Sequence, residues 1–208
     1  MILIPELEAV LLLTPRNASG ALYRAVLERH PKSIMLYRHM EAQNVPLGYD
    51  RWRKIGVVRE PVSRLWSFYN FFKQISRSDK ARIYPEWGAK IRRSVDRTFD
   101  DWITGNTVVF SAGHDGDYAS DFYPFYVVSQ QIPENCKSQF ITLRPDLGTK
   151  VFRFEDELDA LCDALAVTLP TANATTSGEP PALGAEAVRH VERHFAWDLA
   201  FYSSAGAA

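Results

Sequence analysis

Short apolar runs followed by helix-opening turns constrain the fold of this chain most strongly. Glu8–Thr14 is a short apolar run ended by Pro15, as is typical of a buried strand. Ser19 can then cap the helix that follows. Lys54–Val58 repeats the pattern, and Pro61 stands where the first turn of a helix tolerates proline. Strands alternating with helices predict a mostly parallel sheet covered on both faces.

Composition and periodicity predict the other elements. The remaining predicted strands are Ser33–Tyr37, Gln139–Thr142 and Lys150–Phe154. Predicted helices are Ser19–Arg29, a segment opened by Pro61, most of Asp79–Gly105, Asp156–Ala166 and, as one helix or a pair, Gly184–Tyr202. Turn residues predict loops over Gly105–Asp121 and Thr171–Pro181. With no repeat or long linker, we expect a single α/β domain over residues 1–208.

Charge is unevenly distributed, although the formal net charge is only −1. Arg51–Arg97 holds 13 Lys or Arg against 4 Asp or Glu, whereas Val151–Ala208 holds 3 against 9. The basic segment either focuses an anionic ligand or forms a solvated helical face. Two cysteines give no disulfide framework. The run Ala9–Leu13 is too short to span a membrane, and the N-terminus lacks a signal-peptide pattern, so we expect a cytoplasmic protein without membrane or nucleic-acid partners.

The loop Thr14–Gly20 connects the first apolar run to a helix. A loop in this position directs backbone N–H groups and the positive end of the helix dipole at one point, which favours an anion. Arg16 can add guanidinium donors and Ser19 a hydroxyl. The loop lacks the Gly-Lys-Ser/Thr ending of a Walker A motif. An ordinary strand-to-helix turn capped by Ser19 is the alternative interpretation.

A second group of polar residues follows Lys54–Val58. Arg59 stands at the carboxyl end of this strand, where open α/β sheets bind ligands. Ser67 lies about two turns into the next helix, and an arginine with a hydroxyl suits a phosphate monoester. For Arg64 we favour an ion pair with Glu60 or a solvent-facing position over an anion contact.

These motifs resemble those of the sulfotransferases that use 3′-phosphoadenosine 5′-phosphosulfate (PAPS). Val58–Tyr69 is similar to the family's 3′-phosphate motif, and Thr14–Gly20 to its 5′-phosphosulfate loop. Arg153–Leu158 resembles its strand-to-helix junction, and Glu192–Tyr202 the tail of carbohydrate-type and bacterial members. The resemblance implies that PAPS is bound by Arg16, Asn17, Ala18, Ser19, Gly20, Ala21, Arg59 and Ser67.

The resemblance also implies a P-loop-like three-layer sandwich and direct in-line transfer of a sulfuryl group without a metal. The acceptor would be a hydroxyl or amine of a small molecule or glycan, such as a carbohydrate. Arg16 stands where many members have lysine, and the glycine-rich C-terminal loop of the hormone-sulfating branch has no match, which weakens any inference toward steroids or phenols. A small P-loop-type kinase and a non-catalytic nucleotide-binding protein are the alternatives.

His39 is the predicted general base, because it closely follows the strand Ser33–Tyr37 and histidine titrates near neutrality. Similar sulfotransferases carry a His or Glu base near this point, and Glu41 is the rival. Arg16 is the second predicted catalytic residue. His190 and His194 have the i, i+4 spacing of metal ligands, but no third ligand is evident, so no metal site is predicted.

Overall fold

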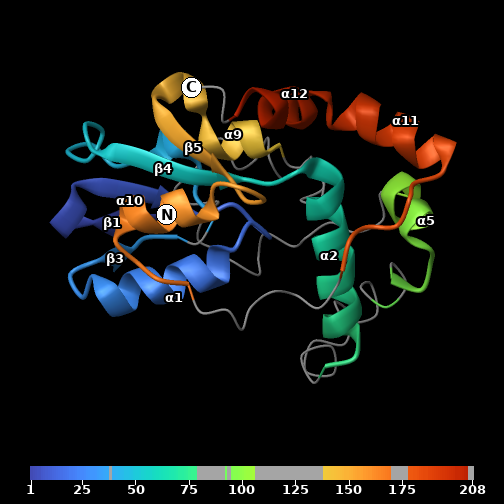
Figure 1. The fold of residues 1–208 in the computed structure, drawn as a ribbon, viewed down its shortest axis with the longest axis horizontal. Coiled ribbons are helices and arrows are strands. Elements are labelled where there is room, and N and C mark those ends of the chain that lie inside the picture. Colours follow the sequence, from blue (N-terminus) through green and yellow to red (C-terminus); the bar gives the residue numbers. More distant parts are fainter. Residues whose placement is uncertain (38, 79–91, 93–94, 106–137, 170–177, 206–208) are drawn as a thin grey trace. The chain divides into compact units, whose positions relative to one another are not determined.

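The computed structural model describes residues 1–37, 39–78, 92, 95–105, 138–169 and 178–205, and Figure 1 shows their fold. The chain separates into two compact units. Unit 1 comprises Met1–Glu60, Ser138–Ala174 and Trp197–Ala208, and unit 2 comprises Pro61–Lys137 and Thr175–Ala196. Within the described ranges, no helix combines the length and apolar character needed to cross a membrane.

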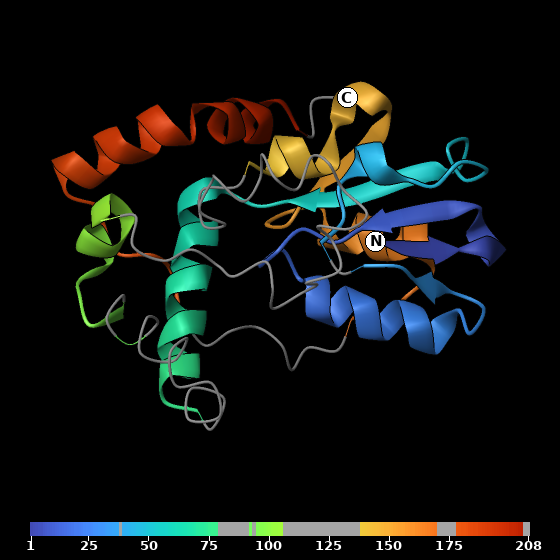
Figure 2. The same cartoon turned by 180° about the vertical axis from the view of Figure 1, so that it is seen from behind.

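Unit 1 is built on a five-stranded sheet with the order β3-β1-β2-β4-β5 (Figure 1, and from behind in Figure 2). Its strands are β1 (Ile2–Ile4), β2 (Ala9–Leu12), β3 (Ile34–Met35), β4 (Arg53–Val58) and β5 (Thr149–Arg153). β2 pairs in parallel with β4, and β4 with β5. β1 pairs antiparallel with both β2 and β3. The predicted α/β class is confirmed.

The sheet is mixed, so the expectation of a mostly parallel sheet needs correction. The difference lies at the N-terminus, where β1 was not predicted. Only the short 3-10 helix η1 (Pro5–Leu7) and Glu8 separate β1 from β2. Because parallel neighbours need a crossover of about a dozen residues or more, this connection permits only an antiparallel pairing.

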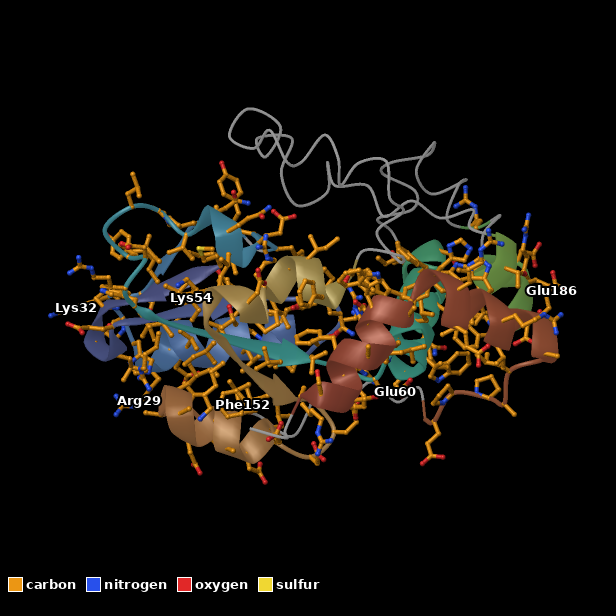
Figure 3. All side chains as sticks on the ribbon, turned by 90° about the horizontal axis from the view of Figure 1, so that it is seen from above. Arg29, Lys32, Lys54, Glu60, Phe152 and Glu186 are labelled. Carbon is orange, nitrogen blue, oxygen red and sulfur yellow. The ribbon has the colours of Figure 1, made fainter. Side chains whose placement is uncertain are left out.

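One face of the sheet packs against α1 (Ser19–Arg29) and α10 (Leu158–Leu165). Alternate strand residues point to this face, which gives a continuous buried cluster. Strand members are Ile2, Ile4, Ala9, Leu11, Ile55, Val57 and Phe152; helix members are Leu22, Ala25, Val26, Leu161 and Leu165. Figure 3 labels Phe152, which lies between the strands and α10. The span of α1 agrees with the predicted helix, and the amphipathic helix predicted at Asp156–Ala166 is confirmed in α10.

The other face packs against α9 (Gln139–Leu143), where a strand was predicted over Gln139–Thr142. That prediction was wrong. The Ser138 hydroxyl accepts the N–H of Phe140, which caps a helix, and Arg144 adopts a left-handed conformation (φ 46°) that ends it. In addition, β4 has β2 on one side and β5 on the other, which leaves no edge for another strand beside it.

Unit 2 contains α2 (Pro61–Ser76), α5 (Phe99–Gly105) and α11 (Ala185–His194). Trp66, Tyr69, Phe99 and Trp102 form a cluster of aromatic rings whose neighbouring centroids are 4.9–6.2 Å apart. The predicted start of a helix at Pro61 is confirmed.

Several predicted elements fall wholly or partly outside the described residues. Of the helix predicted over Asp79–Gly105, the described part includes α5. The loop at Gly105–Asp121 lies almost entirely outside the described residues, as does most of Thr171–Pro181. Of the two alternatives for the terminal segment, one helix or a pair, the structure contains the pair α11 and α12 (Ala196–Ser204).

Gly56 of β4 permits the close approach of α9. A Cβ atom on Gly56 would clash with Cδ2 of Leu143, whose side chain is fully buried. We expect Gly56→Ala to lower the free energy of unfolding by about 1–3 kcal/mol through overpacking. Urea denaturation measures this change. In the double variant with Leu143→Ala the two effects should be strongly non-additive, and simple additivity would refute the predicted clash.

Candidate anion-binding site

The loop between β2 and α1 has an unusual backbone. Arg16 (φ 67°) and Ala18 (φ 56°) both adopt the left-handed conformation, which is uncommon for residues with a Cβ. Ala18, rather than Ser19, occupies the cap position, and Ser19 is the first helical residue. The helix cap is therefore one residue earlier than predicted. The first N–H groups of a helix have no acceptor within it, so those of Ser19 and Gly20 are at the positive end of the α1 dipole.

Asn17 holds this loop against the end of β4. Its side chain is buried, and Nδ2 donates to the carbonyl oxygen of Val57 at 2.7 Å and to Oε1 of Gln139 at 2.6 Å. Its backbone N–H donates to the carbonyl of Thr14 at 3.3 Å. These contacts fix the shape of the loop, and the predicted contact of Asn17 with the nucleotide stays a prediction.

Arg59 follows β4 directly and reaches the same loop. Its Nη1 donates to the carbonyl oxygen of Arg16 at 3.1 Å, and its guanidinium carbon lies 4.5 Å from the ring centroid of Phe154. Within the described structure, its Nε is a buried donor without an acceptor. Unit 1 therefore brings together two predicted site residues that are 43 positions apart in the chain.

The electrostatics of this pair favour an anion. Burial, with added repulsion from Arg59, lowers the pKa of Arg16 to about 10. The pKa of Arg59 is also lowered, mainly by burial, while Glu155 and Glu60 act in the opposite direction. Arginine stays protonated at physiological pH. The lowered pKa values therefore express mainly the cost of burying two cations, to which the nearby charge of Arg59 adds at Arg16, and a bound anion would offset that cost.

His39, the predicted general base, lies beside the loop. Its Nδ1 lies 2.8 Å from the carbonyl oxygen of Leu13, the residue before the loop begins at Thr14. Because a carbonyl only accepts, Nδ1 must carry the proton, and Nε2 of a neutral ring holds the lone pair. Glu41, the rival base, is 6% exposed and accepts a hydrogen bond from Asn44 at 2.9 Å.

Ser67 belongs to unit 2, where it lies in α2 and is 1% exposed. Its pairing with Arg59 stays a prediction. Arg64, on the same helix, is 2% exposed, and its guanidinium carbon lies 5.3 Å from the ring centroid of Phe68. The solvent-facing alternative for Arg64 was therefore wrong, because a guanidinium that packs on an aromatic ring can be accommodated away from water, while the ion pair with Glu60 stays a prediction.

Gln139 was not identified from the sequence, although its side chain contacts both halves of the site. Its Oε1 accepts from the backbone N–H of Arg59 at 2.9 Å, and its Nε2 donates to the carbonyl of Arg59 at 2.8 Å. One signal was present: Ser138 precedes a short run that ends just before Pro145, a spacing that suits a capped helical turn.

His190 and His194 lie close together on α11. The ring centroids of His190 and His194 are 4.3 Å apart. In the part of the chain that the structure describes, no three His, Cys, Asp or Glu side chains form a cluster suited to a metal ion.

No family model, curated protein sequence or solved structure matches this chain. Its function must be inferred from its motifs and from the geometry of this site.

Gly20 offers a test of ligand approach. A Cβ at this position meets no atom within 4 Å, so packing does not require glycine. Gly20→Ala should raise the free energy of unfolding by about 0.5–1 kcal/mol, because alanine is favoured in a helix. If an anion approaches this backbone, the same change should weaken its binding. Thermal melts with and without sulfate measure both effects, and Ala21→Gly should have the reverse effect on stability. Undiminished stabilisation of Gly20→Ala by sulfate would argue against close approach.

Proposed function

We propose that this chain is a PAPS-dependent sulfotransferase that acts in the cytoplasm on a hydroxyl or amine acceptor, such as a carbohydrate. One observation carries the proposal: the Arg59 guanidinium contacts the Arg16 loop at the carboxyl ends of the parallel strands β2 and β4. This is where an open α/β sheet binds its ligand. The motif resemblance around both arginines supports a donor with phosphate and sulfate groups. The layers on the two faces of the sheet suit a P-loop-like sandwich.

In this proposal the loop and Arg16 serve the reacting end of the donor. The acceptor oxygen or nitrogen attacks sulfur, and the bond between sulfur and the bridging oxygen breaks. The electron pair of that bond leaves with adenosine 3′,5′-bisphosphate. Backbone N–H groups at the start of α1 and the Arg16 guanidinium would stabilise the charge that develops on the leaving oxygen.

Arg59 and Ser67 would hold the 3′-phosphate and so orient the donor. The stacking of Arg59 on Phe154 limits its rotation, and its Nε remains a buried donor without an acceptor in the described structure. A phosphate oxygen would satisfy that donor through a charge-assisted hydrogen bond.

His39 would accept the proton of the attacking acceptor. The hydrogen bond from Nδ1 to Leu13 selects the tautomer in which Nε2 can act as a base. It also anchors the ring to the main chain of Leu13, which directly precedes the loop.

Nucleotide selectivity provides the first test of this proposal. Adenosine 3′,5′-bisphosphate should raise the melting temperature more than AMP or ATP does, because it alone has a 3′-phosphate. Each charge-assisted contact contributes roughly 1.5–3 kcal/mol. Arg59→Ala should remove most of the difference between the bisphosphate and AMP. Arg53→Ala, at the opposite and exposed end of β4, is the matched control. Equal stabilisation by AMP, or preference for ATP, would contradict the proposal.

The base is tested by sulfate transfer. His39→Ala should lower the rate by about 10² to 10⁴, the usual contribution of a positioned base, while affinity for the bisphosphate stays unchanged. His194→Ala, an exposed histidine in unit 2, should behave like the wild type. Full activity of His39→Ala on an established acceptor would exclude it as the base.

A further inference from the structure

We propose that Gln139 is a positioning residue that sets the geometry between the Arg16 loop and Arg59. This inference rests on the proposed function, because its importance depends on an anion bound by these two elements. It begins with the burial of the Gln139 side chain, which is 0% exposed in the described structure. A buried amide without partners would be costly, so its hydrogen bonds define what it does.

The amide of Gln139 binds both backbone groups of Arg59. Oε1 accepts the N–H of Arg59 at 2.9 Å, and Nε2 donates to its carbonyl at 2.8 Å. Two bonds to one residue fix both the position and the rotation of that peptide segment. Arg59 has just left β4, so Gln139 replaces the ladder partner that the strand would otherwise supply.

The same oxygen also holds the loop. Oε1 accepts a second hydrogen bond from Nδ2 of Asn17 at 2.6 Å, while Asn17 also donates to Val57 at 2.7 Å. Gln139 therefore contacts the backbone of Arg59 and the side chain of Asn17, the residue that follows Arg16. The Arg59 guanidinium closes this hydrogen-bond network by donating to the carbonyl of Arg16.

The main chain of Gln139 is held in turn by Asp198 of α12, which is 1% exposed. Its backbone N–H donates to both carboxylate oxygens of Asp198, at 2.8 and 3.0 Å. Ser138 Oγ donates to the same carboxylate at 2.5 Å. A carboxylate at the start of α9 also interacts favourably with the helix dipole. The C-terminal part of the chain thereby fixes the residue that positions the site.

The experiment compares two substitutions of Gln139. Gln139→Met keeps the volume of the side chain and removes all three hydrogen bonds that its amide makes to Arg59 and Asn17. Gln139→Glu keeps the shape, and when protonated its hydroxyl can donate to the Arg59 carbonyl as the amide did. When ionised it loses that donation and brings a negative charge beside Arg59 and Asn17, and so closer to the bound anion. The groups facing this side chain are Arg59 and Asn17, and Asp198 faces its backbone.

Affinity for adenosine 3′,5′-bisphosphate is measured by calorimetry between pH 5 and 8.5, well below the melting temperature of each variant. Gln139→Met should weaken binding roughly ten- to hundredfold at every pH, as expected when a binding group is slightly misplaced. Gln139→Glu should approach the wild type at pH 5 and lose affinity as the pH rises. The affinity of each variant is divided by that of the wild type at the same pH, so that ionisation of the ligand's own phosphates cancels.

Thr142→Val is the matched control, because it removes a buried hydroxyl from the same helix without touching Arg59 or Asn17. It should keep wild-type affinity even if it lowers the melting temperature. Wild-type affinity in both Gln139 variants, or an equal loss in Thr142→Val, would overturn the positioning role.

Inorganic sulfate serves as the second probe in the same titrations. If the wild type binds sulfate but not the bisphosphate, the proposed function fails, while the sulfate affinities of the variants still test Gln139. If the wild type binds neither anion, both proposals are overturned.

Discussion

The fold of unit 1 and its candidate site both depend on one buried polar contact, the hydrogen bond between the side chains of Asn17 and Gln139. Through Val57 and Arg59, these two amides join the loop after β2, the end of β4 and the start of α9. Hydrophobic packing alone would hold the helices against the sheet without defining these ends, because apolar contacts have little directionality. The hydrogen bonds of the two side-chain amides are directional and define where these segments lie. If one of the segments were displaced, several buried polar groups would lose their hydrogen-bond partners.

The sequence predicted the elements whose signals are local. The apolar run before Pro15, the helix Ser19–Arg29 and the helix opened by Pro61 are all confirmed, because periodicity and proline report directly on local conformation. The motif arguments also selected Arg16, Arg59 and His39, which unit 1 gathers at the carboxyl ends of β2 and β4.

Tertiary context accounts for what the sequence analysis missed. The segment Gln139–Thr142 is apolar enough for a strand, and the side chain of Ser138 together with the neighbours of β4 make it a helix. The antiparallel β1 was missed because its direction depends on the short connection to β2. Gln139 was missed because a lone glutamine has no local pattern. Its importance depends on contacts with residues 80 and 122 positions away.

Those separations also affect when the site can form. The contacts that define it span 43 residues between Arg16 and Arg59, 122 between Asn17 and Gln139, and 59 between Gln139 and Asp198. Closing such long loops is slow, and chains dominated by distant contacts fold slowly. During synthesis, the loop and both arginines leave the ribosome well before the carboxylate that completes their support. A nascent chain that ends before Asp198 would expose an unfinished pair of cations, and the candidate anion-binding site would be completed only after Asp198 has been made.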